Sequence, residues 1–128
     1  VQLLSRRFEA VGEEAYIPLN LTEQVGLFTV QSLDLERVTL EFGGRYEHTD
    51  VRSAPLGVSR NFDAFSGSAG FSVPVGGAFR FAASAAYTER APSAEELFAN
   101  GAHAATRTFE IGDVDLAKER SFGVEALL

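Results

Sequence analysis

One histidine, His103, lies in a stretch of the sequence that is rich in carboxylates. Glu110 and Asp113 follow it, and Glu95 and Glu96 precede it. A neutral imidazole and carboxylate oxygens are ligands that Zn²⁺ accepts, with water completing the shell. The sequence therefore predicts His103, Glu110 and Asp113 as candidate metal ligands. The alternatives are that His103 is a solvated loop residue, and that Glu95 and Glu96 only complement the dipole of a helix first turn.

A second and weaker candidate is His48 with Asp50. Glu47 lies beside them, but neighbouring residues of a regular strand point to opposite faces, so Glu47 and His48 are not expected to share a ligand. The alternative is an interfacial histidine at a strand end. The chain has no Cys, which excludes disulfides and thiolate metal sites. It also has no Ser-His-Asp arrangement, phosphate-binding glycine loop or helical histidine pair, so no enzyme is expected.

The elements that would position these residues are β-strands, because apolar residues recur at every second position. Residues 38–48 have one apolar and one charged face, and similar alternation occurs in residues 65–73, 79–88 and 121–128 and, more weakly, in residues 23–31. The predicted fold class is all-β, an antiparallel up-and-down meander of about five to six strands.

The connections between the predicted strands alternate in length. Short turns are expected at residues 34–36 and 74–77, and long loops at residues 6–20, 49–61 and 90–117. In a meander, alternate connections lie at the same end of the sheet, and transmembrane β-barrels place their long loops at one end in this way. A soluble antiparallel sandwich or a lipocalin-like barrel would also show alternating strands. One short helix is expected near residues 92–98, with Ser93 as its N-cap.

Charge and hydropathy restrict the class of protein further. A net charge of −7 argues against nucleic acid as a partner and is compatible with a surface that attracts cations. The apolar runs are far too short for a membrane helix of about 20 residues, whereas a membrane β-strand needs only about 9–11. Tyr46 and Tyr87 lie near strand ends, where an aromatic girdle would form. The chain begins at Val1 and contains no Met, so we expect a mature or excised piece of a longer protein.

Three stretches carry a family resemblance: residues 89–101 (ERAPSAEELFANG), 108–113 (TFEIGD) and 116–119 (LAKE). They resemble the late barrel of TonB-dependent outer-membrane receptors, in which an R-A-P-(S/T)-x-x-E-L-(F/Y) junction and a G-D-x-x-L-x-x-E strand entry recur. Residues 100–110, together with residues 12–18 and 40–47, are similar to the zinc-uptake branch of that family. That branch more often has Pro where this chain has Ala102.

The resemblance implies that residues 1–128 form part of a receptor barrel of about 22 strands, without the N-terminal plug domain. It implies the outer membrane of a Gram-negative bacterium, contact with outer-membrane lipid, and energisation by the TonB complex through the plug. The implied function is active uptake of a metal ion or metal chelate. Zn²⁺ would be the transported ligand and not a resident cofactor, and His103 would join ligands supplied by the plug.

Two alternatives to zinc uptake stay open at this point. One is a haem or siderophore receptor barrel, and the other is a soluble β-sheet binding module. In either barrel case the isolated segment is expected to self-associate through its two unpaired edge strands.

Overall fold

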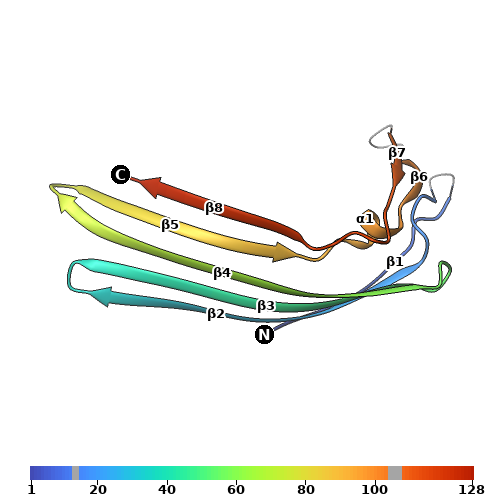
Figure 1. Cartoon of the computed structure of the whole chain (residues 1–128), viewed down its shortest axis with the longest axis horizontal. Helices are drawn as coiled ribbons and strands as arrows, with labels where there is room; N and C mark the ends of the chain where they lie inside the picture. The colour runs from blue at the N-terminus through green and yellow to red at the C-terminus, as the bar shows by residue number, and fades with distance from the viewer. Residues whose placement is uncertain (13–14, 104–107) are drawn as a thin grey trace.

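The computed structural model describes residues 1–12, 15–103 and 108–128, and within them the chain is almost entirely β-structure. Six strands form one antiparallel sheet in the order β1-β2-β3-β4-β5-β8 (Figure 1). The predicted meander is confirmed, and so is the short helix inside its longest loop. The elements are β1 Gln2–Phe8, β2 Asn20–Leu35, β3 Val38–Ser53, β4 Val58–Gly76, β5 Phe79–Arg90, α1 Ala94–Phe98, β6 Asn100–His103, β7 Thr108–Ile111 and β8 Glu119–Leu127.

The central strands are longer than the sequence pattern predicts. A long loop is expected at residues 49–61, but the pairing of β3 with β4 continues without a break from Thr49↔Phe62 to Ser53↔Val58. That loop prediction is wrong because polar residues interrupt the apolar alternation here. Thr49, Val51 and Ser53 are nevertheless buried, so the strand is held by what packs on it. Strand β1 also lies partly in a segment predicted as loop.

The two ends of the sheet are unlike. The tight turns that join β2 to β3 and β4 to β5 lie at one end, and α1, the β6–β7 hairpin and the β1–β2 connection gather at the other (Figure 1). Alternate connections therefore share an end, as the predicted meander requires. We call the second of these the loop end.

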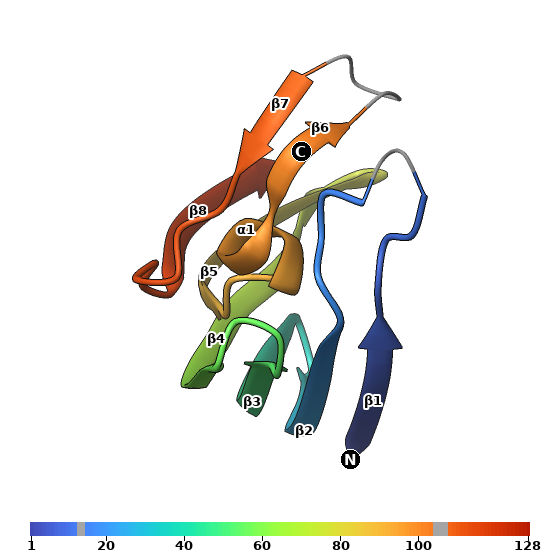
Figure 2. The same cartoon turned by 90° about the vertical axis from the view of Figure 1, so that its right-hand side faces the viewer.

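The two faces of the sheet are also unlike. The inner face, defined as the one that α1 covers, buries Val51 and Phe62 against Leu97 and Phe98. Figure 2 shows the sheet curving around α1. The opposite, outer face keeps large apolar side chains exposed: Phe42, Phe65, Phe71, Phe122 and Val124. Besides the six-stranded sheet, the described residues form only the β6–β7 hairpin, which stands at the loop end, so the two stacked sheets of a soluble sandwich are not formed.

Aromatic residues line the outer face across the middle of the sheet. Tyr46 pairs across the strands with Phe65, and their ring centroids are 5.0 Å apart. Tyr87 pairs with Phe122 on the next strands. A row of aromatic residues beside an apolar band is typical of the water-facing border of a membrane β-barrel.

Helix α1 forms because its first turn caps itself. The Glu96 N–H donates to Ser93 Oγ at 3.2 Å, and the Ser93 N–H donates to Glu96 Oε2 at 2.7 Å. This reciprocal capping box satisfies two backbone donors that a helix start leaves open. The helix ends after Phe98, where Ala99 turns to an extended conformation and leads into β6.

Arg90, the last residue of β5, joins three elements. Its guanidinium donates to Glu96 in α1 at 2.9 Å and to Glu119 at the start of β8 at 2.8 Å. The loop between β5 and β8 therefore leaves and re-enters the sheet at one charged point. Charge-assisted bonds of this kind are stronger than neutral hydrogen bonds.

The Glu96→Gln variant is expected to remove an acid-sensitive part of the stability. Hydrogen bonds from Arg90 and from the Ser93 N–H lower the pKa of Glu96 from its ordinary 4.5 to about 2. The carboxylate therefore stabilises the fold fully above pH 4.5, and that contribution is lost as the pH falls toward about 2. Thermal unfolding at about pH 7 and about pH 3 should show a wild-type advantage over Glu96→Gln that shrinks at the lower pH.

The matched control for that experiment is Glu95→Gln. Glu95 lies in the same helix turn and pairs with Arg6 at 2.8 Å, but the Ser93 N–H of the capping box donates to Glu96 and not to Glu95. An equal wild-type advantage over Glu96→Gln at both pH values would contradict the assignment.

Candidate functional site

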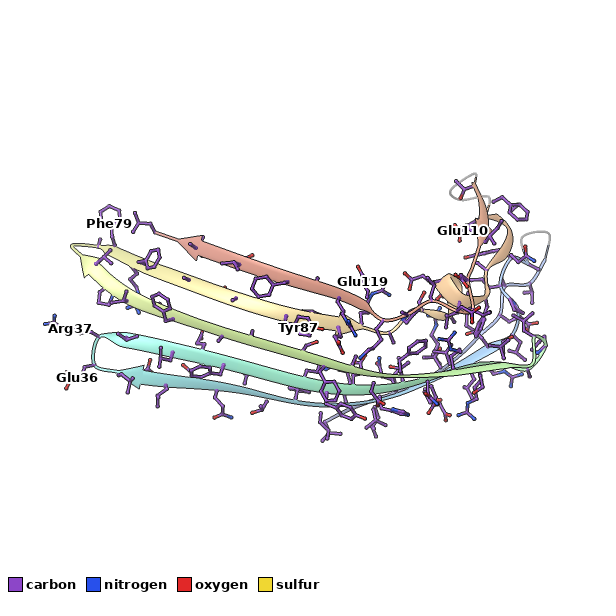
Figure 3. The ribbon with its side chains drawn as sticks, in the orientation of Figure 1. Glu36, Arg37, Phe79, Tyr87, Glu110 and Glu119 are labelled. Atoms are coloured by element: carbon purple, nitrogen blue, oxygen red, sulfur yellow. The ribbon has the colours of Figure 1, made fainter. Side chains whose placement is uncertain are left out.

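His103 lies on the β6–β7 hairpin at the loop end. In the register of this hairpin, His103 is opposite Thr108 and Gly101 is opposite Glu110, so His103 and Glu110 share one face. Figure 3 shows Glu110 at the end of the molecule away from Glu36 and Arg37, which mark a tight turn. Residues 104–107, which join the two strands of the hairpin and belong to the resemblance motif, lie outside the described residues, as do Glu13 and Glu14.

The side chains of His103 and Glu110 are in direct contact. His103 Nδ1 lies 2.7 Å from Glu110 Oε1, and the two side chains are about one quarter to one third exposed. A carboxylate on one ring nitrogen fixes the orientation of an imidazole and raises the basicity of the other nitrogen. Two of the three predicted ligands are therefore brought together.

Asp113, the third predicted ligand, takes part in the return of the loop toward β8. Its carboxylate accepts the Asp115 N–H at 2.8 Å, and its own N–H donates to the Glu96 carbonyl at 2.9 Å. Within the described parts of the chain, no group of three or more His, Asp or Glu side chains is placed so that it could hold a metal ion. The described residues thus supply at most a partial site.

Glu95 and Glu96 are engaged elsewhere, in the ion pairs with Arg6 and Arg90. Both lie in the first turn of α1, which agrees with the alternative that they serve the helix.

His48 lies between two carboxylates on the outer face. Its Nδ1 is 2.8 Å from Asp63 Oδ1, and its Nε2 is 3.4 Å from Asp50 Oδ2. Asp63 also accepts the hydroxyl of Tyr46 at 2.7 Å. Asp63 was not predicted, because it is brought beside His48 only by the register of β3 with β4. The cluster lies beside the aromatic row. The alternative prediction for His48 was an interfacial histidine rather than a metal ligand.

Glu89 and Lys118 close a gap in the sheet. The backbone pairing of β4 with β5 begins at Gly67↔Tyr87. Nearer the loop end, hydrogen bonds from side chains connect the two strands instead. Glu89 Oε2 accepts the Phe65 N–H at 3.0 Å and the Lys118 ammonium at 2.6 Å. The Glu89 side chain is only 8% exposed. The segment that returns from the hairpin is therefore pinned to both strands.

Tyr16 belongs to residues 12–18 of the resemblance, but the sequence does not predict it as a site residue. It comes from the β1–β2 connection, and its ring stacks on that of His103 with centroids 4.5 Å apart and an interplanar angle of 17°. The available signal was Gly101, since a Cβ at that position would lie 3.0 Å from Tyr16 Cα. A glycine at a close approach of two backbones is recognisable in sequence only when the partner segment is known.

A meander of long strands with its long loops gathered at the loop end defines a class of protein, the membrane β-barrel. The family model described as "TonB dependent receptor-like, beta-barrel" matches residues 6–126, and the chain belongs to this family. Proteins of this family are outer-membrane transporters of Gram-negative bacteria that interact with TonB and are not enzymes, so the chain is assigned to transport. No solved structure matches the chain. The described residues contain no helix of sufficient length and hydropathy to cross a membrane.

The Gly112→Ala variant is expected to disturb the base of the hairpin. A Cβ at Gly112 would lie 2.7 Å from the Leu97 carbonyl carbon and 2.8 Å from the Ala99 nitrogen, both backbone atoms that cannot move aside singly. We expect a loss of about 1–3 kcal/mol in the free energy of unfolding, as overpacking typically causes. Chemical denaturation of the purified receptor measures it.

Gly44→Ala is the control for this variant. An added Cβ at Gly44 meets only Thr29 Cγ2, at 3.9 Å, which is an ordinary contact. Equal stabilities of the two variants would show that the close approach at Gly112 does not constrain the loop.

Proposed function

We propose that this chain is part of the barrel of an outer-membrane receptor that takes up a metal ion or metal chelate, with zinc as the metal. The observation that carries the proposal is the 2.7 Å contact between His103 Nδ1 and Glu110 Oε1. Histidines that bind metal commonly have a carboxylate on their second nitrogen. The similarity of residues 100–110 to the zinc-uptake branch supports the same metal.

In this proposal His103 is a zinc ligand and Glu110 orients its ring or supplies an oxygen donor. The remaining donors would be water and residues outside the described part of the chain, such as those of a plug domain. Asp113 stays a predicted ligand, and its carboxylate would have to leave the Asp115 N–H to reach a metal ion. His48 and Asp50 likewise stay weaker predictions.

The loop end suits capture of a ligand from outside the cell. Long loops of outer-membrane barrels face the exterior, and the hairpin with His103 is among them. Residues 1–128 would then supply part of the barrel wall and part of the capture site. The plug and the TonB complex would release and translocate the metal under force from the inner membrane.

A haem or siderophore receptor is the second candidate, and one observation favours it. A cavity of about 500 Å³ lies beside the hairpin, and apolar side chains form about half of its exposed lining. Tyr16, Ile17, Phe98 and Ile111 contribute to its wall. An apolar wall suits the organic part of a chelate better than it suits a hydrated ion.

The His103→Ala variant of the intact receptor is expected to lose zinc binding. Removal of a direct ligand should weaken binding by at least about 100-fold, because the loss of an outer partner alone costs 10–100-fold. Titration calorimetry with Zn²⁺ measures the affinity, and His48→Ala tests the weaker candidate in the same way. Unchanged zinc affinity in His103→Ala would overturn the proposal. Haem binding without zinc binding would favour the second candidate.

We also propose that the isolated segment of residues 1–128 self-associates. In it, strands β1 and β8 are the two edges of the sheet, and the apolar outer face is exposed. Unpaired edges of this kind pair with other chains. Light scattering after gel filtration should show dimers or larger species, and a monodisperse monomer in plain buffer would contradict this.

A further inference from the structure

We propose that Tyr16 is a positioning residue that holds the imidazole of His103 in its binding orientation. The β1–β2 connection would thus contribute one residue to the site, and the β6–β7 hairpin, far along the chain, would contribute the others. The inference rests on the proposed function only in taking His103 as a metal ligand.

The first support is the ring contact. Tyr16 lies on the face of the His103 imidazole, at 4.5 Å and 17°, while Glu110 meets the edge of the same ring at Nδ1. A hydrogen bond at the edge leaves rotation about that bond open, and a stacked ring removes it. The two contacts together restrain both the position and the plane of the imidazole.

The second support is that the backbone of Tyr16 is itself held. The Asn100 N–H, in β6, donates to the Tyr16 carbonyl at 2.7 Å. The next residue, Ile17, accepts the Ala10 N–H at 3.1 Å, and its side chain is 1% exposed. The ring of Tyr16 is therefore presented from a fixed segment that is joined to the hairpin it serves.

The third support is the close approach of the two segments at Gly101. A Cβ there would lie 3.0 Å from both Cα and Cβ of Tyr16. Glycine lets the β1–β2 connection lie near enough to the hairpin for Tyr16 to reach His103. A larger residue would move the two segments apart and would leave the side chains of His103 and Tyr16 themselves unchanged.

These contacts predict different effects of substitutions on zinc affinity. Tyr16→Phe keeps the ring and should keep zinc affinity, whereas Tyr16→Ala removes it and should weaken affinity by about 10-fold, as the loss of an outer partner does. Gly101→Ala should weaken binding in the same direction while both aromatic side chains remain. Val11→Ala is the control, because Val11 belongs to the same connection and is 79% exposed.

The experiment uses the intact receptor and two readouts. Calorimetric titration with Zn²⁺ gives the affinity of each variant. NMR of histidine-labelled receptor, with the His103 resonance assigned from His103→Ala, reports the ring-current shift that a stacked Tyr16 ring imposes. The expected result is a shift and an affinity that are retained in Tyr16→Phe and lost together in Tyr16→Ala and Gly101→Ala.

Three results would overturn the inference. The first is unchanged affinity in Tyr16→Ala, and the second is an affinity in Tyr16→Phe as low as in Tyr16→Ala, which would make the hydroxyl a ligand. The third is an unshifted His103 resonance in the wild type. If zinc affinity survives His103→Ala, the proposed function fails, and the resonance still decides whether Tyr16 holds His103.

Discussion

The ion network of Arg90 is the interaction on which the loop end depends. One guanidinium at the end of β5 binds the carboxylates of Glu96 in α1 and Glu119 in β8. Because these elements are separated in sequence, the network defines where the long loop departs and where it returns. Glu96 also belongs to the capping box of α1, and its carbonyl accepts the Asp113 N–H where the loop returns. A loop of this length would otherwise have a large conformational entropy to lose.

The sheet itself is built as one wall of a barrel. Its outer face carries exposed apolar and aromatic side chains along its length, and α1 packs on its inner face at the loop end. Strands β2 and β3 have 16 residues each and β4 has 19, more than the about 9–11 that cross a bilayer. At the loop end, Val51 of β3 and Phe62 of β4 pack against α1.

The candidate site combines a local and a distant contribution. His103 and Glu110 meet because they are neighbours across a short hairpin, whereas Tyr16 arrives from the opposite part of the chain. Backbone hydrogen bonds join the base of the hairpin to both neighbours: the Asn100 N–H donates to the Tyr16 carbonyl, and the Asp113 N–H donates to the Glu96 carbonyl of the helix.

The sequence by itself determined the features that depend on spacing along the chain. Alternation at every second residue defined the strands and the two faces, and Ser93 with Glu96 defined the helix start, since both signals lie within a few residues. Only the tertiary structure decided the distant partners: Asp63 for His48, Lys118 for Glu89 and Tyr16 for His103. The extension of β3 to Ser53 was decided in the same way, by burial beside α1. Pairings of this kind depend on strand register and on the path of the loops, which chain spacing does not encode.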